Sequence, residues 1–141
     1  MRKSSLTAEE RLQRQGQVGP SRIANLIVIG ASAGGHRALM EILKGFSAVM
    51  PAAIVILQHM PLEYVRSLKK WLGRFSRLPI IAVENHEPLQ QGFIFVPPPG
   101  RSATFSCGMI TAEHEIGERS VSTIDRLFTS AAQSYGRPSS A

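Results

Sequence analysis

The sequence predicts an α/β fold with a doubly wound, mostly parallel sheet of the Rossmann-like kind, together with an antiparallel hairpin. Two short apolar runs rich in branched residues, 26–29 and 52–57, lie on either side of a stretch with helical spacing. A strand, a helix and a strand within about thirty residues have the size of a βαβ unit, whose strands are parallel and whose crossover is right-handed. Short strand-like pieces separated by turn residues further along predict the hairpin.

The two predicted parallel strands, 26–29 and 52–57, consist of apolar residues alone, as expected for strands that are covered on both faces. Gly30 ends the first strand and Pro51 precedes the second. The helix between them is predicted from apolar residues at helical spacing, which are Ala38, Leu39, Ile42, Leu43 and Phe46. We therefore expect both strands to end at the same edge of one sheet.

The remaining elements follow in order, and the whole is expected to form one domain. They are a helix over 62–75, a strand over 79–83, three short strands at 93–96, 103–105 and 109–111, and a helix over 124–135. The domain is expected over 23–136, after a flexible polar arm over 1–22 and before an aberrant or truncated tail over 137–141.

Composition excludes several classes of protein. A chain of 141 residues with 43% hydrophobic residues can bury one core. No apolar run reaches the roughly 18 residues that span a bilayer, and no secretory signal is visible, so we expect a cytoplasmic protein without membrane insertion. Cys107, the single cysteine, excludes an internal disulfide. The net charge of +6 is scattered and lacks interleaved aromatic residues, which disfavours nucleic-acid binding.

Gly30-Ala31-Ser32-Ala33-Gly34 matches the G-x-S-x-G pattern directly after a predicted strand and before a helix. A serine at such a turn has its hydroxyl presented outward, beside free N–H groups at the start of the helix that can stabilise an oxyanion. The alternative is that Ser32 caps the helix and the glycines permit a tight turn. The pattern meets neither the dinucleotide fingerprint nor the P-loop, although an anion at the helix N-terminus remains an alternative.

His59 follows the second predicted strand, so Ser32 and His59 are expected at the carboxyl ends of neighbouring parallel strands. Open α/β sheets bind ligands at that edge, and a histidine there can act as the general base for a serine. The other histidines, His36, His86 and His114, are interpreted as surface residues, and no pair has metal-ligand spacing.

Serine hydrolysis usually requires a third group that orients the histidine. The one aspartate, Asp125, is in the first turn of the last predicted helix, where we interpret it as stabilising the helix dipole. Five glutamates are interpreted as solvated loop or strand-end residues, namely Glu84, Glu87, Glu113, Glu115 and Glu118. The acidic partner is therefore not identified.

The runs 26–35 (Leu-Ile-Val-Ile-Gly-Ala-Ser-Ala-Gly-Gly) and 58–61 (Gln-His-Met-Pro) resemble the catalytic domain of CheB-type protein-glutamate methylesterases. Segments 87–89, 96–100 and 122–132 resemble the same family in its order. The resemblance implies hydrolysis of glutamate methyl esters on methyl-accepting chemotaxis receptors, with receptor glutamine deamidation in some members. It implies Ser32 as the nucleophile, His59 as its base, and no cofactor or metal.

Two departures from the family modify that expectation. We expect the family's usual N-terminal phosphoacceptor receiver domain to be absent, because about twenty polar residues cannot form one, and we therefore expect no regulation by phosphorylation within this chain. The family also continues past the equivalent of 135–136 into a strand and a loop bearing the triad aspartate, so we expect a fold that is incomplete at its C-terminus and impaired catalysis. The alternatives are a non-catalytic receptor-binding or pseudoenzyme fragment and, less favoured, an anion-binding module.

Overall fold

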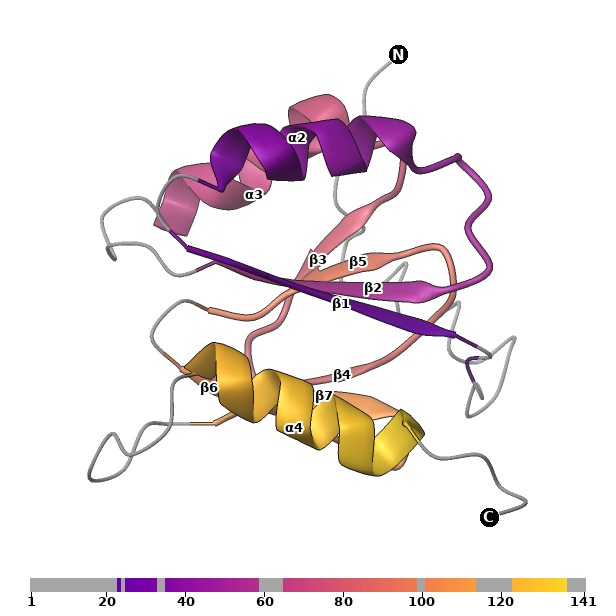
Figure 1. The fold of residues 1–141 in the computed structure, drawn as a ribbon, viewed down its shortest axis with the longest axis vertical. Coiled ribbons are helices and arrows are strands. Elements are labelled where there is room, and N and C mark those ends of the chain that lie inside the picture. Colours follow the sequence, from indigo (N-terminus) through magenta and orange to yellow (C-terminus); the bar gives the residue numbers. More distant parts are fainter. Residues whose placement is uncertain are drawn as a thin grey trace.

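A computed structural model describes residues 23, 25–32, 35–58, 65–98, 101–113 and 123–136 (Figure 1). The elements are β1 (Leu26–Ala31), α2 (His36–Gly45), β2 (Ala53–Gln58), α3 (Val65–Phe75), β3 (Ile80–Ala82), β4 (His86–Pro88), β5 (Ile94–Val96), β6 (Ser102–Ser106), β7 (Met109–Glu113) and α4 (Thr123–Tyr135).

The central sheet has the order β1-β2-β5-β3, and every pair of neighbouring strands in it is parallel. The predicted α/β class with a mostly parallel sheet is confirmed. The predicted hairpin is also confirmed, as β6 and β7 joined at Cys107 and Gly108, both of which have positive φ. It belongs to a separate sheet of order β4-β7-β6, because β4, which was not predicted, pairs with β7.

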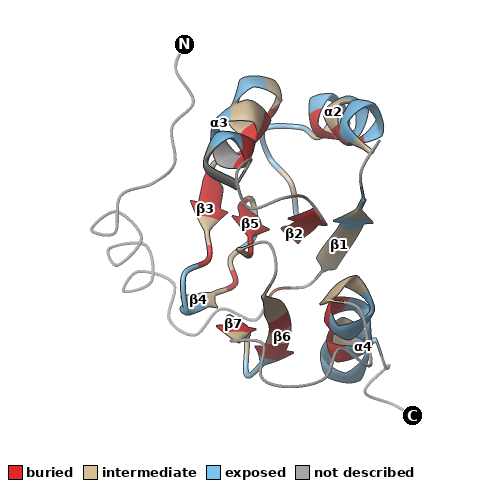
Figure 2. Ribbon diagram, turned by 90° about the vertical axis from the view of Figure 1, so that its left-hand side faces the viewer, coloured by how far each residue is buried: buried red, intermediate tan, exposed pale blue. Residues whose placement is uncertain are grey.

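The parallel sheet has an apolar core on each face. Helices α2 and α3 cover one face, and the small sheet with α4 covers the other (Figures 1 and 2). β2 is buried along its whole length because it lies between β1 and β5, and its side chains alternate between the two cores. β1 lies at the outer edge of the sheet, and its residues are only partly buried (Figure 2).

Two serines of α4 bind the free edge of β6. The N–H of Phe105 donates to Oγ of Ser130 over 2.8 Å, and Oγ of Ser134 donates to the carbonyl of Phe105 over 3.0 Å. Leu127, one turn before Ser130, is fully buried in the core below β1. An edge strand has backbone groups that no neighbouring strand pairs, and the two serines pair those of Phe105. These hydrogen bonds, together with the burial of Leu127, hold α4 against β6 and below β1.

We predict that Ser130→Ala lowers the free energy of unfolding by about 1–3 kcal/mol, because it leaves the buried N–H of Phe105 without an acceptor. Urea denaturation followed by circular dichroism measures the change. Thr129→Ala, one residue earlier on the exposed side of α4, is the matched control and should change stability by less than about 0.5 kcal/mol. Equal effects of the two substitutions would contradict the role given to Ser130.

Candidate functional site

Ser32 follows β1 and is exposed, three residues before the N-cap of α2. The N-cap is Gly35, which receives no side-chain hydrogen bond. Its N–H donates to the carbonyl of Ser32 over 2.9 Å, so the turn is closed through the backbone. The N-cap residue is thus Gly35, and the alternative in which Ser32 is the N-cap of the helix is wrong.

His59 lies outside the described residues, but the strand that leads to it is described. β2 ends at Gln58, and Gln58 is the register partner of Ala31 at the end of β1. Ala31 and Gln58 are thus paired directly in the parallel ladder, and Ser32 and His59 are the residues that follow them. The predicted placement of both positions after neighbouring strand ends at one sheet edge agrees with the register, while the distance between their side chains stays a prediction.

Gly30 lets α4 approach β1 closely just before the serine. A Cβ placed on Gly30 would lie 2.6 Å from Cγ2 of Ile124 and 3.1 Å from Cε2 of Phe128. Real Cβ contacts are essentially never that short, so the first glycine of the G-x-S-x-G pattern is required for helix packing. The first turn of α4 therefore lies against the end of β1 that leads to Ser32.

Gln58 is a polar residue at this edge that sequence reasoning missed. Its side chain is 1% exposed, and its Nε2 lies 3.1 Å from Nδ1 and 3.3 Å from Nε2 of His36. This contact joins the end of β2 to the first residue of α2. Oε1 of Gln58 is buried and has no hydrogen-bond partner among the described residues. The signal in the sequence that could have identified Gln58 is that it is the one polar residue of β2, at the end of an otherwise apolar strand.

His36 is exposed, as the sequence predicted, yet it belongs to this edge. Its ring makes an edge contact with Trp71 of α3 at 5.5 Å between centroids, and Trp71 in turn contacts Phe75. His36 is the first residue of α2, whose opening N–H groups have no acceptor within the helix. Gln58 at the end of β2 and His36 at the start of α2 therefore form a polar contact at the edge of the sheet where β1 and β2 end.

The other candidate residues lie elsewhere or outside the described residues. Asp125 is in the first turn of α4, as predicted. Glu113 of β7 accepts from Oγ1 of Thr104 and pairs with Arg126 of α4, and His86 of β4 contacts Thr111 of β7. Glu84 is exposed and Glu87 is part of β4. His114, Glu115 and Glu118 lie outside the described residues.

Within the described ranges, no group of three or more histidine, cysteine, aspartate or glutamate side chains could hold a metal ion. None of the described helices is long and apolar enough to cross a membrane.

Comparisons with known proteins agree on one family. A family model described as CheB methylesterase matches residues 27–141. The chain is 33% identical over 129 residues to a protein-glutamate methylesterase/protein-glutamine glutaminase of Anaeromyxobacter dehalogenans, covering 89% of this chain and 38% of that protein. A protein of the same description from Hahella chejuensis is 32% identical over 114 residues, covering 79% and 33%.

Among solved structures, the CheB methylesterase catalytic domain of Thermotoga maritima matches with a TM-score of 0.66 and 29% identity. The match covers 79% of this chain and 61% of that domain. Against the two curated relatives, the chain spans 38% and 33% of the relative's length, so it corresponds to about a third of such a protein.

We predict that Gly30→Ala lowers the free energy of unfolding by about 1–3 kcal/mol, because the added methyl group forces Ile124 and α4 away from β1. Thermal and urea unfolding of the purified variant measure the change. The matched control is Gly45→Ala in α2, where a Cβ meets nothing within 4 Å. That substitution should leave stability unchanged or raise it by up to about 1 kcal/mol. A loss at Gly45 as large as that at Gly30 would contradict the packing argument.

Proposed function

Because the chain belongs to the CheB methylesterase family, we propose that it acts on glutamate methyl esters of chemotaxis receptors, with Ser32 as nucleophile and His59 as general base. The observation that carries the proposal is the register of the sheet: Ala31 and Gln58 are paired, and the exposed serine and the histidine are the residues that follow them. Deamidation of receptor glutamine, which the relatives' names include, is the related reaction.

In the proposed reaction, Oγ of Ser32 attacks the ester carbonyl carbon while His59 takes the hydroxyl proton. The tetrahedral intermediate collapses, the bond to the methoxy group breaks, and methanol leaves with that proton. Water then attacks the acyl-enzyme with His59 again acting as base, which releases the glutamate carboxylate and restores Ser32. Free N–H groups in the first turn of α2 are suited to stabilise the oxyanion.

We assign the acidic partner of the histidine to none of the described residues. Asp125 has a role in the first turn of α4, and the carboxylate of Glu113 is engaged by Thr104 and Arg126. A serine–histidine pair without such a partner works more slowly by roughly four orders of magnitude. The proposed turnover of this chain is accordingly low.

The proposed partners are methyl-accepting chemotaxis receptors. A net charge of +6 favours approach to an acidic protein surface through long-range attraction. The second candidate function is receptor binding without catalysis, by a fragment in which Ser32 and His59 have no chemical role. It is favoured because no described carboxylate is assigned as the partner of the histidine, and it requires that receptor binding be independent of Ser32.

We predict that the chain releases methanol slowly from methylated chemoreceptor membranes and that Ser32→Ala lowers this release to the level of membranes alone. Radiolabelled methyl groups make slow release measurable. Ser106→Ala, at an exposed position in β6, is the control and should retain the full rate. Receptor binding by both variants without any serine-dependent methanol would contradict the esterase and support the binding module.

A further inference from the structure

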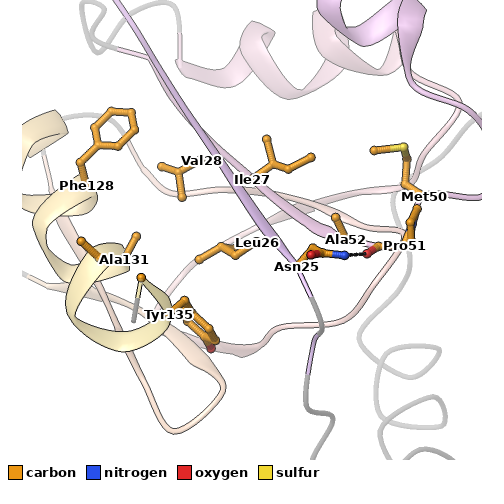
Figure 3. A pocket seen from close by; sticks show the side chains of 12 residues that line it. Asn25, Leu26, Ile27, Val28, Met50, Pro51, Ala52, Phe128, Ala131 and Tyr135 are labelled. Carbon is orange, nitrogen blue, oxygen red and sulfur yellow. Dashed lines mark hydrogen bonds between the residues drawn. The ribbon is translucent and has the colours of Figure 1, made fainter. Parts of the chain in front are cut away.

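The face of the protein that α2 and α3 form has an excess of positive charge. α2 contains two lysine and arginine residues and α3 contains four, whereas Glu41 is the one acidic residue in the sequence of the two helices. On the other side of the sheet, α4 contains one residue of each sign. The groove of about 710 Å³ along β1, beside α4, has no charged residue among those described as its lining (Figure 3). The fold thus gathers on one face cations that are scattered along the sequence.

The described cations of α3 point away from the sheet. Lys70 and Arg74 lie on the side of the helix opposite Leu68 and Leu72, because successive helical residues are about 100° apart. Both leucines are buried in the core between the helices and the sheet, whereas Lys70 and Arg74 are exposed. Arg77, just after the end of α3, is exposed as well. Three cations of this segment therefore face solvent.

Aromatic contacts place the cations of α2 beside those of α3. The ring of His36 contacts Trp71, and Nζ of Lys44 lies 5.6 Å from the centre of the Phe75 ring, within the range of a cation–π contact. The two contacts follow each other in the same direction along both helices, so α2 and α3 lie side by side and parallel (Figure 2). Arg37, exposed in the first turn of α2, and Lys44 therefore lie on the same face as the cations of α3.

The basic face, defined by the exposed cations Arg37, Lys44, Lys70, Arg74 and Arg77, forms no ion pair with any described residue. The ion pair that the described residues do form joins α4 to β7, on the other side of the sheet. The two cations of α2 are seven residues, about 10 Å, apart, and the two of α3 are four residues, about 6 Å, apart. Glutamates with the same spacings in a partner helix have the same separations. Unpaired cations gathered in this way favour a partner with complementary charges.

We propose that the basic face binds an acidic α-helical segment of a partner protein, whose carboxylates pair with the exposed lysines and arginines of α2 and α3. The arginines suit carboxylates because a guanidinium can bind both oxygens of one carboxylate. α2 begins four residues after Ser32, so a helix on this face extends to the edge at which Ser32 lies. Identifying the partner as the chemotaxis receptor, whose hydrolysed esters are glutamate carboxylates, rests on the proposed function, whereas the charge of the face does not.

The exposed apolar residues favour a protein partner over a membrane surface. The large hydrophobic side chains that are exposed among the described residues are Ile42, Val49 and Phe128. Phe128 is on α4, Val49 lies after the end of α2, and Ile42 is on the side of α2 away from α3, opposite the contacts of His36 and Lys44. The basic face therefore lacks the apolar anchors that insert beside lipid headgroups.

The probe is an alanine-rich helical peptide with glutamates four and seven residues apart along one side, added to the full 141-residue chain. Trp71 is the single tryptophan of the sequence and lies between the cations of the two helices, so its fluorescence reports on this face. The peptide should change Trp71 emission in a saturable way, and its affinity should fall as salt is added, because salt screens exposed charges. The same peptide with glutamine in place of glutamate should not bind.

Arg74→Glu should weaken binding of the glutamate peptide by about fivefold or more, because it places a like charge opposite the carboxylates. The matched control is Arg126→Glu on α4, which changes the net charge equally and should change the affinity by less than about twofold. Circular dichroism checks that both variants are folded.

Equal weakening by the two substitutions, or equal binding of the glutamine peptide, would overturn the proposal. So would a response of Trp71 to vesicles of equimolar phosphatidylcholine and phosphatidylserine without a response to the peptide, since the face would then bind lipid. Serine-dependent methanol release without peptide binding would contradict this inference alone. Peptide binding that Arg74→Glu weakens, without such release, would support it and contradict the proposed esterase.

Discussion

The parallel pairing of β1 with β2 is the interaction on which the rest of the structure depends. Six consecutive pairs, from Leu26 with Ala53 to Ala31 with Gln58, fix where both strands end. A slip by one residue would exchange the faces of β1 and turn Ile27 and Ile29 away from α2. The same register brings the position of Ser32 to the edge at which His59 follows β2. The fold and the proposed site are thus set by one ladder of backbone hydrogen bonds.

The second constraint is the attachment of α4 from below. Ser130 and Ser134 hold the helix to β6, and Gly30 allows its first turn to touch β1. Arg101, just before β6, stabilises the small sheet to which β6 belongs. Its guanidinium donates to the carbonyls of Ala112 and Glu113 in β7 and of Glu84 before β4. α4 in this position forms one wall of the groove along β1. β1 is therefore held in place by its pairing with β2 and by the packing of α4 at Gly30.

The sequence was sufficient for the features that depend on hydrophobic pattern. Runs of branched residues predicted β1 and β2, and helical spacing predicted the helices, because both patterns follow directly from burial. β4 was missed because His86-Glu87-Pro88 is polar and contains proline, and its strand character comes from pairing with β7. Gln58 was missed because its one local signal, a polar residue at the end of an otherwise apolar strand, does not distinguish a buried amide from an exposed one. Gly30 was expected to serve the turn, and its contact with Ile124 joins residues almost a hundred positions apart.

The most direct test of the proposed site is covalent labelling of the folded chain with a fluorophosphonate, followed by peptide mass spectrometry. We expect one slow adduct, on Ser32, whose rate falls strongly in His59→Ala and is unchanged in His86→Ala, an exposed histidine of the small sheet. This result would show that the residues after Ala31 and Gln58 meet and act as nucleophile and base. A folded chain in which Ser32 is not labelled, or is labelled at the same rate without His59, would contradict the account.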